Sequence, residues 1–162
     1  MPTQFLLNLF IATLWYLLID DPNTNFTDFM AGFLVGVVIL YAMHRFFGTK
    51  FYLQRLFKIV QLGLLFISEL IRSSYFVLKL ILTPKLTITP GIFKYKTKLN
   101  GDWEITALAL LLTLTPGSVV MEVSEDGNEF YIHAMDLEET KEALIRSLGK
   151  FEKAIMEVSR ND

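Results

Sequence analysis

Two long apolar runs fill the beginning of the chain and predict membrane helices. The first extends from Phe5 to Ile19 and the second from Phe26 to Phe47, with the polar segment 20–23 between them. A helix needs roughly 17–25 residues to cross a bilayer, so the first run is slightly short and the second is long enough. The chain begins without a basic segment, and the first run ends without a small-residue cleavage pattern. We therefore expect a retained helix here and not a secretory signal.

A third apolar stretch, from Arg55 to Leu82, differs from the first two because it carries charges. At about 100° per residue its polar side chains share one arc of about a third of the helix: Arg55, Lys58, Gln61, Glu69, Arg72 and Lys79. Either this helix lies along the cytoplasmic interface with the stripe toward water and headgroups, or it spans with Glu69 and Arg72 paired and turned toward a partner. A central charge facing lipid costs roughly 2.5–3.5 kcal/mol, so the stripe favours the first arrangement.

Basic residues lie on only one side of the second run. Residues 44–58 contain His44 and several Lys and Arg side chains but no acid, whereas residues 20–25 contain no Lys or Arg. The positive-inside rule places 44–58 in the cytoplasm and 20–25 outside. Two spans would leave the C-terminal half in the cytoplasm, as we expect, and three spans would place it outside.

Small residues mark one side of the second run. Gly32 and Gly36 are four residues apart, and Ala31 adjoins them. Such spacing allows two helices to approach closely. The glycines would pack either against the first helix of the same chain or against a helix of a partner subunit.

Shorter periodicities after Pro84 and Pro90 predict a soluble domain. We divide the chain into a transmembrane or interfacial helical region, 1–83, and a soluble α/β domain, 84–162. In chain order the patterns predict strands over 85–89 and 92–99, a helix over 105–114, strands over 118–124 and 129–135, and a helix over 137–158. The fold class is a membrane α-helical region, with two spans plus a charge-striped third helix or with three spans, followed by a small domain of β-α-β-β-α order.

The connections within this domain suit turns and caps. The helix over 105–114 is almost wholly apolar but too short to span a membrane, so we expect it under the sheet. Thr115, Pro116 and Gly117 then end it, and Asp136 is placed to cap the last helix. The acidic segment 125–129 predicts a hairpin turn, since the full spacing of a calcium loop is missing.

Composition excludes several classes of function. The chain of 162 residues is 52% hydrophobic, has a formal net charge of −2 and contains no cysteine. Thiol chemistry, disulfides and cysteine-bound zinc are therefore excluded, and no dense basic face is available for nucleic acid. Residues 1–83 hold few charges, whereas residues 84–162 hold most of the acids. The first half is thus suited to lipid and the second half to water.

No motif predicts a catalytic group, a cofactor or a metal site. His44 and His133 stand apart from any nucleophile, and we expect His133 to form structural hydrogen bonds. A carboxylate within an apolar helix is a candidate for ion transport, which makes Glu69 the residue to consider. A single acid close to Arg72 suits a structural ion pair better than a proton pathway.

Two segments resemble one family closely. Residues 112–120, Leu-Thr-Leu-Thr-Pro-Gly-Ser-Val-Val, and residues 130–136, Phe-Tyr-Ile-His-Ala-Met-Asp, resemble the MrpE/MnhE family, the E subunits of the Mrp-type multisubunit cation/proton antiporters. That family has an L-T-P-G-T element followed by a strand reading V-H-x-L-D, after hydrophobic N-terminal helices. This chain departs mildly, with Ser118 where Thr is frequent and Met135 where Leu is frequent.

The resemblance implies a supporting role in a large complex of the cell membrane that exchanges Na+ for protons. The partners would be the other antiporter subunits and membrane lipids, with no small-molecule substrate bound by this subunit alone. In this family ion conduction is assigned mainly to larger subunits. Two other hypotheses fit the residues alone: a small membrane enzyme that uses His44 and Glu69, and a self-assembling anchor or channel that packs through Gly32 and Gly36.

Overall fold

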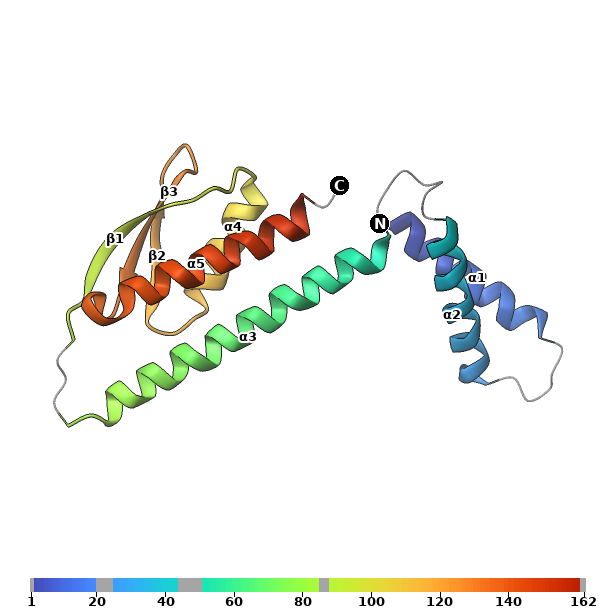
Figure 1. Cartoon of the computed structure of the whole chain (residues 1–162), viewed down its shortest axis with the longest axis horizontal. Coiled ribbons are helices and arrows are strands. Elements are labelled where there is room, and N and C mark those ends of the chain that lie inside the picture. Colours follow the sequence, from blue (N-terminus) through green and yellow to red (C-terminus); the bar gives the residue numbers. More distant parts are fainter. Residues whose placement is uncertain (1, 20–24, 44–50, 85–87, 161–162) are drawn as a thin grey trace. The chain divides into compact units, whose positions relative to one another are not determined.

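The computed structural model describes residues 2–19, 25–43, 51–84 and 88–160, and these form two compact units (Figure 1). The units are residues 1–57 and 58–161. Most of the third helix therefore packs with the C-terminal domain. The boundary at 83/84 was predicted from the change in composition and not from contacts, and it stays a prediction.

Two apolar helices make up most of the first unit. Helix α1 spans Pro2–Leu18 and α2 spans Phe26–Met43. At the start of α2, the Asp28 carboxylate accepts a hydrogen bond of 2.8 Å from the backbone N–H of Asn25. Within the described ranges, α2 is the one helix long and apolar enough to cross a membrane, whereas α1 is a shorter apolar helix. The predicted extension of α2 to Phe47 and the loop 20–23 lie outside the described residues.

Both glycines of α2 face α1. A Cβ atom at Gly32 would lie 2.6 Å from Cβ of Trp15, and one at Gly36 would overlap Oδ1 of Asn8. The clash with Trp15 could not be relieved without moving α1, because Cβ is bonded directly to the backbone, and the clash with Asn8 would displace an amide that the Tyr52 hydroxyl holds. The sequence left open whether these glycines pack against the first helix or against a partner subunit. In the structure they pack against α1 of the same chain.

Polar side chains of α1 are buried against the start of the third helix. Asn8 donates a hydrogen bond of 2.9 Å from Nδ2 to the Tyr52 hydroxyl, and the Tyr52 backbone N–H donates one of 2.9 Å to Oε1 of Gln4. Asn8, Gln4 and Tyr52 are all buried. One backbone N–H at the start of the third helix, that of Tyr52, is therefore satisfied by a side chain from α1.

An antiparallel sheet of three strands forms the centre of the second unit. Its strands are β1 (Gly91–Lys96), β2 (Ser118–Val123) and β3 (Glu129–Ala134), in the order β1-β3-β2. The register pairs Phe93 with Ile132 and Val120 with Ile132, so the same face of all three strands points inward. An irregularity between Val120 and Glu122 interrupts the β2–β3 pairing.

The first predicted strand of this domain is wrong for its described part. Residues 88–90 are not in a strand, and 85–87 lie outside the described residues. The Thr89 carbonyl instead accepts the Leu137 N–H at 2.8 Å, which ties this segment to the last helix. Strand β1 also ends at Lys96 rather than Leu99, because Lys96 already pairs with Glu129, the first residue of β3.

Two helices cover the inner face of the sheet. Helix α4 spans Asp102–Thr113 and α5 spans Leu137–Ser159. Their buried side chains join those of the strands in one core: Phe93, Leu99, Leu108, Leu112, Phe130, Ile132, Ala134, Leu148, Phe151 and Ile155. Helix α4 is only half buried, since Leu110 remains 57% exposed.

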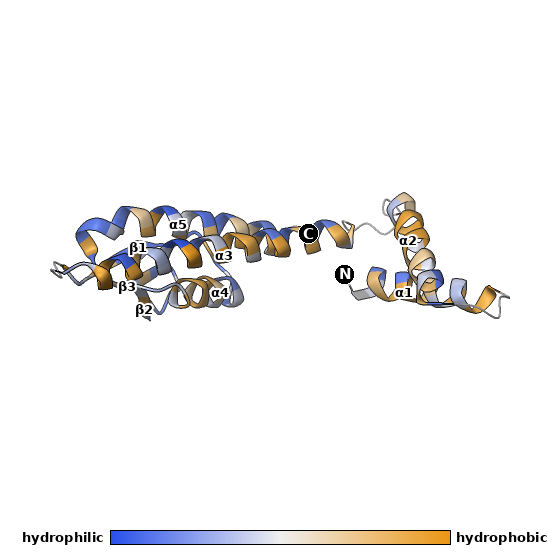
Figure 2. Ribbon diagram, turned by 90° about the horizontal axis from the view of Figure 1, so that it is seen from below, coloured by the Kyte–Doolittle hydropathy of each residue, from blue (hydrophilic) through white to orange (hydrophobic). Residues whose placement is uncertain are grey.

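Helix α3 (Tyr52–Leu82) lies beside α5 and has two different sides (Figures 1 and 2). Leu62, Leu65 and Phe66 pack against the core of the domain. The opposite side exposes a continuous row of large apolar residues: Ile59, Val60, Leu64, Ile67, Ile71, Tyr75, Leu78, Ile81 and Leu82. A helix with this pattern has one side that the rest of the described chain leaves uncovered.

Candidate functional site: the pocket between α3 and α5

The segment Thr115–Gly117 forms the turn between α4 and β2. The Thr115 hydroxyl donates a hydrogen bond of 2.6 Å to the Leu112 carbonyl, which satisfies the end of α4. Gly117 has a φ of +92°, a conformation that side chains disfavour. Its carbonyl accepts the Met135 N–H at 2.9 Å, and a Cβ atom at this position would lie 3.5 Å from Val77 of α3. The turn thus joins α4, β3 and α3.

Asp136 is buried at the start of α5. Its carboxylate accepts hydrogen bonds from the Glu139 N–H at 3.3 Å and from the Thr89 hydroxyl at 3.0 Å. A carboxylate here caps the helix and interacts favourably with the positive end of its dipole. Asp136 therefore fixes both the start of α5 and the segment that enters β1.

Glu69 lies on the side of α3 that faces α5. Its carboxylate accepts hydrogen bonds of 2.9 Å from Lys150 and 2.8 Å from Ser147. Burial would raise the pKa of Glu69, but these hydrogen bonds, together with the charges of Lys150 and Arg72, hold it below the usual range. The side chain is thus a buried, ionised anchor between the two helices.

A second ion pair joins the same helices. Lys58 of α3 lies 2.6 Å from Glu157 of α5. Two residues of the charged stripe, Lys58 and Glu69, therefore contact the C-terminal domain of their own chain, whereas Gln61, Arg72 and Lys79 are exposed. This corrects one sequence expectation, because Glu69 pairs with Lys150 rather than with Arg72. The reason is that α5 presents Lys150 at hydrogen-bonding distance, whereas Arg72 acts on Glu69 only through its charge.

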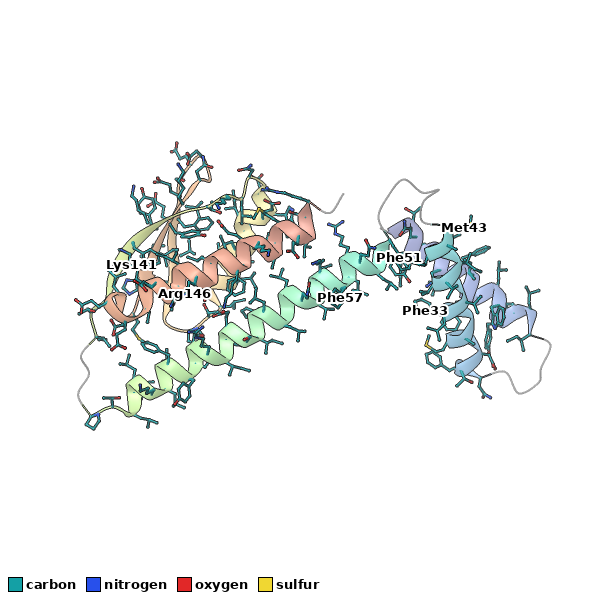
Figure 3. All side chains as sticks on the ribbon, viewed as in Figure 1. Phe33, Met43, Phe51, Phe57, Lys141 and Arg146 are labelled. Carbon is teal, nitrogen blue, oxygen red and sulfur yellow. The ribbon has the colours of Figure 1, made fainter. Side chains whose placement is uncertain are left out.

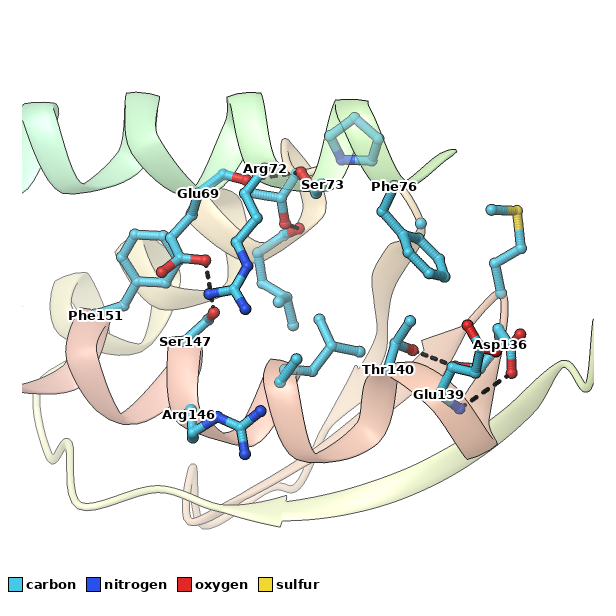
Figure 4. Close-up of a pocket in the computed structure, with 17 residues that line it drawn as sticks. Glu69, Arg72, Ser73, Phe76, Asp136, Glu139, Thr140, Arg146, Ser147 and Phe151 are labelled. Carbon is cyan, nitrogen blue, oxygen red and sulfur yellow. Dashed lines mark hydrogen bonds between the residues drawn. The ribbon is translucent and has the colours of Figure 1, made fainter. Parts of the chain in front are cut away.

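A pocket with a cavity of about 320 Å³ lies between α3, α5 and the 115–117 turn (Figure 4). Apolar side chains such as Phe76, Leu112, Leu144 and Phe151 line its interior. Six of the residues singled out from the sequence also line it: Glu69, Arg72, Thr115, Pro116, Gly117 and Asp136. The fold thus brings together residues that are up to 67 positions apart and that include both family-like segments.

The remaining candidates lie elsewhere. Gly32 and Gly36 belong to the first unit. His133 is in β3, paired with Ile92 and Val119, and is half-buried. Within the described ranges its imidazole has no hydrogen-bond partner, so the structural hydrogen bonds expected for it are not seen. His44 lies outside the described residues.

Three side chains of α5 that contact α3 were not predicted from the sequence. Ser147, Lys150 and Glu157 make the contacts to α3, and their spacing of three and seven residues places them on one face of α5. That spacing was visible in the sequence, but nothing indicated that α3 would lie on this face. No group of three or more His, Asp or Glu side chains in the described part of the chain could hold a metal ion.

Comparison with known proteins identifies the family. Residues 8–158 match a family described as a Na+/H+ ion antiporter subunit. The chain is 47% identical over 160 residues to the E subunit of the Na(+)/H(+) antiporter of Bacillus subtilis strain 168, a match that covers 99% of this chain and 100% of the relative. It is 40% identical over 158 residues to a protein of Staphylococcus epidermidis named as a putative antiporter subunit, and that match covers 97% of this chain and 99% of the relative.

Two solved structures are also similar. A chain of the Mrp complex from Dietzia sp. DQ12-45-1b is 27% identical, with a TM-score of 0.46, and the match covers 63% of this chain and 96% of that chain. A chain of a membrane-bound sulfane sulfur reductase, an archaeal respiratory complex, is 23% identical, with a TM-score of 0.53, and the match covers 96% and 99%. The second likeness shows a shared fold. On its full-length sequence matches, this chain belongs to the family of Na+/H+ antiporter E subunits.

Proposed function

We propose that this chain is an accessory subunit of a multisubunit Na+/H+ antiporter in the cell membrane. The observation that carries the proposal is the match, over nearly the whole chain, to a relative named as the E subunit of such an antiporter. This chain would support the complex and contact its other subunits, and it would not itself be an enzyme.

The distribution of charge agrees with a supporting role. In α1 and α2 the one charged side chain is Asp28, which lies in the first turn of α2. Glu69 of α3, the other candidate for ion transport, is held by Lys150 and Ser147. Because this carboxylate is an ionised structural anchor, it is poorly suited to take up and release protons during transport. The same engagement argues against the enzyme hypothesis that relied on Glu69.

We also propose two membrane spans, α1 and α2, with the C-terminal domain in the cytoplasm. The basic residues after α2 support this orientation through the positive-inside rule. The position of α3 beside α5 supports the count of two. A helix whose Lys58 and Glu69 are both paired with a polar domain cannot cross the hydrocarbon core, because that domain would have to enter the lipid as well.

In this arrangement α3 lies along the cytoplasmic surface of the bilayer. Its exposed apolar side, which includes Leu64, Ile71 and Tyr75, would enter the boundary of the acyl chains. The domain would then lie above the helix, in water. The sequence predicted the same interfacial position for α3. The difference is that Lys58 and Glu69 contact α5 instead of water and headgroups.

Co-purification tests the assignment to a complex. A tagged copy of the full chain, expressed from its own genomic position, is extracted in mild detergent and its partners are identified by mass spectrometry. We expect the large membrane subunits of an antiporter in a fixed ratio to this chain. Recovery of a lone protomer from its native membrane would overturn the proposal.

Cysteine accessibility tests the topology, since the chain has no cysteine of its own. Single cysteines are introduced at Glu125, in the β2–β3 turn, and at Asn25, before α2. A membrane-impermeant maleimide applied to intact cells should label Asn25→Cys and leave Glu125→Cys unlabelled until the cells are opened. Labelling of Glu125→Cys in intact cells would exclude a cytoplasmic domain.

A further inference from the structure

Two guanidinium groups from different helices lie at the pocket between α3 and α5. Arg72 extends from α3 and Arg146 from α5 (Figure 4). Within the described ranges, Arg72 forms no hydrogen bond or ion pair, and it acts on Glu69 through its charge alone. Arg146 has one ion pair, 3.5 Å from the exposed Glu142. Exposed pairs of this kind contribute only about 0–1 kcal/mol, so both guanidinium groups are available to an anion.

Two of the three acids that line the pocket are engaged by other groups. Glu69 is balanced by Lys150, and Asp136 is held by the Glu139 N–H and the Thr89 hydroxyl. Glu139 is the remaining acid of the lining, and its carboxylate has no partner among the described residues. Two weakly engaged guanidinium groups, of Arg72 and Arg146, therefore face one unpaired carboxylate at the pocket.

The chemistry of the two arginines favours phosphate. A guanidinium group presents a planar set of N–H donors that matches two oxygen atoms of a phosphate at once. Two such groups on neighbouring helices can hold different oxygens of one tetrahedral anion.

The interior of the pocket indicates what the phosphate is attached to. Phe76, Leu144 and Phe151 provide an apolar surface next to the arginines. The cavity of about 320 Å³ is at the lower end of the sizes that hold organic ligands. An apolar group joined to a phosphate would satisfy both parts of the lining, and a free inorganic anion would leave the apolar part unused.

We propose that this pocket binds the phosphate group of a phospholipid between Arg72 and Arg146. The choice of a lipid as the source rests on the proposed position of α3 along the bilayer, because Arg72 lies on the same helix as the exposed apolar row. Bound lipid would connect α3 and α5 at the end of the interface away from the Lys58–Glu157 pair. It would thereby link the docking of the C-terminal domain to the membrane.

Lipid binding to the full chain tests this proposal. The protein is purified in mild detergent, and native mass spectrometry measures binding of phosphatidylglycerol and of diacylglycerol with the same acyl chains. The variants are Arg72→Gln and Arg146→Gln, with Lys141→Gln as the matched control. Lys141 is an exposed cation on α5 outside the pocket, and Arg146 lies nearer to α3 (Figure 3).

We expect the parent chain to prefer phosphatidylglycerol over diacylglycerol. Each arginine variant should bind phosphatidylglycerol about tenfold more weakly, as loss of a charge-assisted hydrogen bond predicts, and Lys141→Gln should bind it normally. Glu139→Gln should bind it more tightly, since a repelling charge is removed. Equal binding by the parent chain and both arginine variants would overturn the proposal.

A test with inorganic phosphate distinguishes a free anion from a lipid headgroup as the ligand. If millimolar phosphate raises the melting temperature of the parent chain as much as phosphatidylglycerol does, the pocket takes a free anion and the lipid is the wrong source. Circular dichroism of the arginine variants checks that the helices are retained. Co-purification of Arg72→Gln with antiporter subunits is a separate readout, so loss of lipid binding and loss of the complex can be told apart.

Discussion

The side-chain oxygen Oδ1 of Asn8 occupies the space into which a Cβ atom of Gly36 would project. This oxygen is buried and has no conventional hydrogen-bond partner among the described residues. A Cα–H bond of Gly36 points toward it instead, and such contacts contribute about 0.5–1 kcal/mol. Glycine at this position thus permits close helix packing and supplies a weak donor to a buried amide.

Replacement of Gly36 by Ala should separate α1 from α2. The added methyl group meets the Asn8 amide, which is itself held by the Tyr52 hydroxyl. Overpacking of this kind costs about 1–3 kcal/mol. The measurement is the unfolding of the full chain in mixed micelles with increasing SDS, followed by far-UV circular dichroism.

Gly63→Ala is the matched control for this substitution. Gly63 lies within α3, and a Cβ atom there would have no atom within 4 Å. Alanine is the better helix former, so this variant should gain about 0.5–1 kcal/mol. If the two variants had the same effect, close packing at Gly36 would not be the cause.

The contact between Glu69 and Lys150 predicts a measurable coupling between α3 and α5. Lys150 is 52% exposed and the Glu69 side chain 9%, so solvent weakens the pair, and we expect a coupling energy of about 1 kcal/mol. A double-mutant cycle of Glu69→Gln and Lys150→Met measures it through thermal unfolding. The corresponding cycle with Arg72→Gln should give a smaller value, and a larger one would restore the pairing expected from the sequence.

Periodicity predicted which side of α3 is charged but not what lies against it. The repeat of polar positions follows from helix geometry alone, so it can be found in a single sequence. Lys150, however, is 81 residues further along the chain than Glu69. Its approach depends on how the whole domain folds, and the spacing of Ser147 and Lys150 on α5 fits many possible neighbours.

The same limit applies to the pocket. The end of α4 shortly before Pro116 and the cap at Asp136 follow from local rules, since proline and glycine end helices and carboxylates begin them. That these two segments meet beside α3 follows from the pairing of β2 with β3, which sets the register of Ser118 opposite Ala134. Local sequence placed the parts of the site, and tertiary packing assembled them.

Gly117→Ala should destabilise the domain through the backbone. The residue has a φ of +92°, and left-handed conformations cost an L-residue about 1–2 kcal/mol. The nearest described atom, on Val77, is 3.5 Å from the added Cβ, so steric overlap contributes little. Thermal unfolding of the full chain measures the loss. Gly149→Ala, at an open position within α5, should instead raise the melting temperature, and a fall in both variants would argue against backbone strain.

Acid should weaken the domain in part through Glu104. Its buried carboxylate is hydrogen-bonded by the Ser159 hydroxyl, by Arg160 at 3.2 Å and by the Asn100 N–H at 3.3 Å. Burial raises the pKa of Glu104, but these three donors and the Arg160 charge bring it below the usual range of a glutamate. A folded-state pKa below the unfolded one stabilises the fold above that unfolded value, and the stabilisation is lost as the pH falls through the folded value.

The substitution Glu104→Gln tests this linkage. At pH 7 the variant should be less stable than the parent chain by about 1–3 kcal/mol, because a charged acceptor of three hydrogen bonds is replaced by a neutral one. The difference should shrink as the pH falls below the usual range of a glutamate, where the parent chain also loses its charge. Thermal unfolding of both chains between neutral and acidic pH measures it. A difference that stayed constant over this range would mean that Glu104 acts through packing and not through its charge.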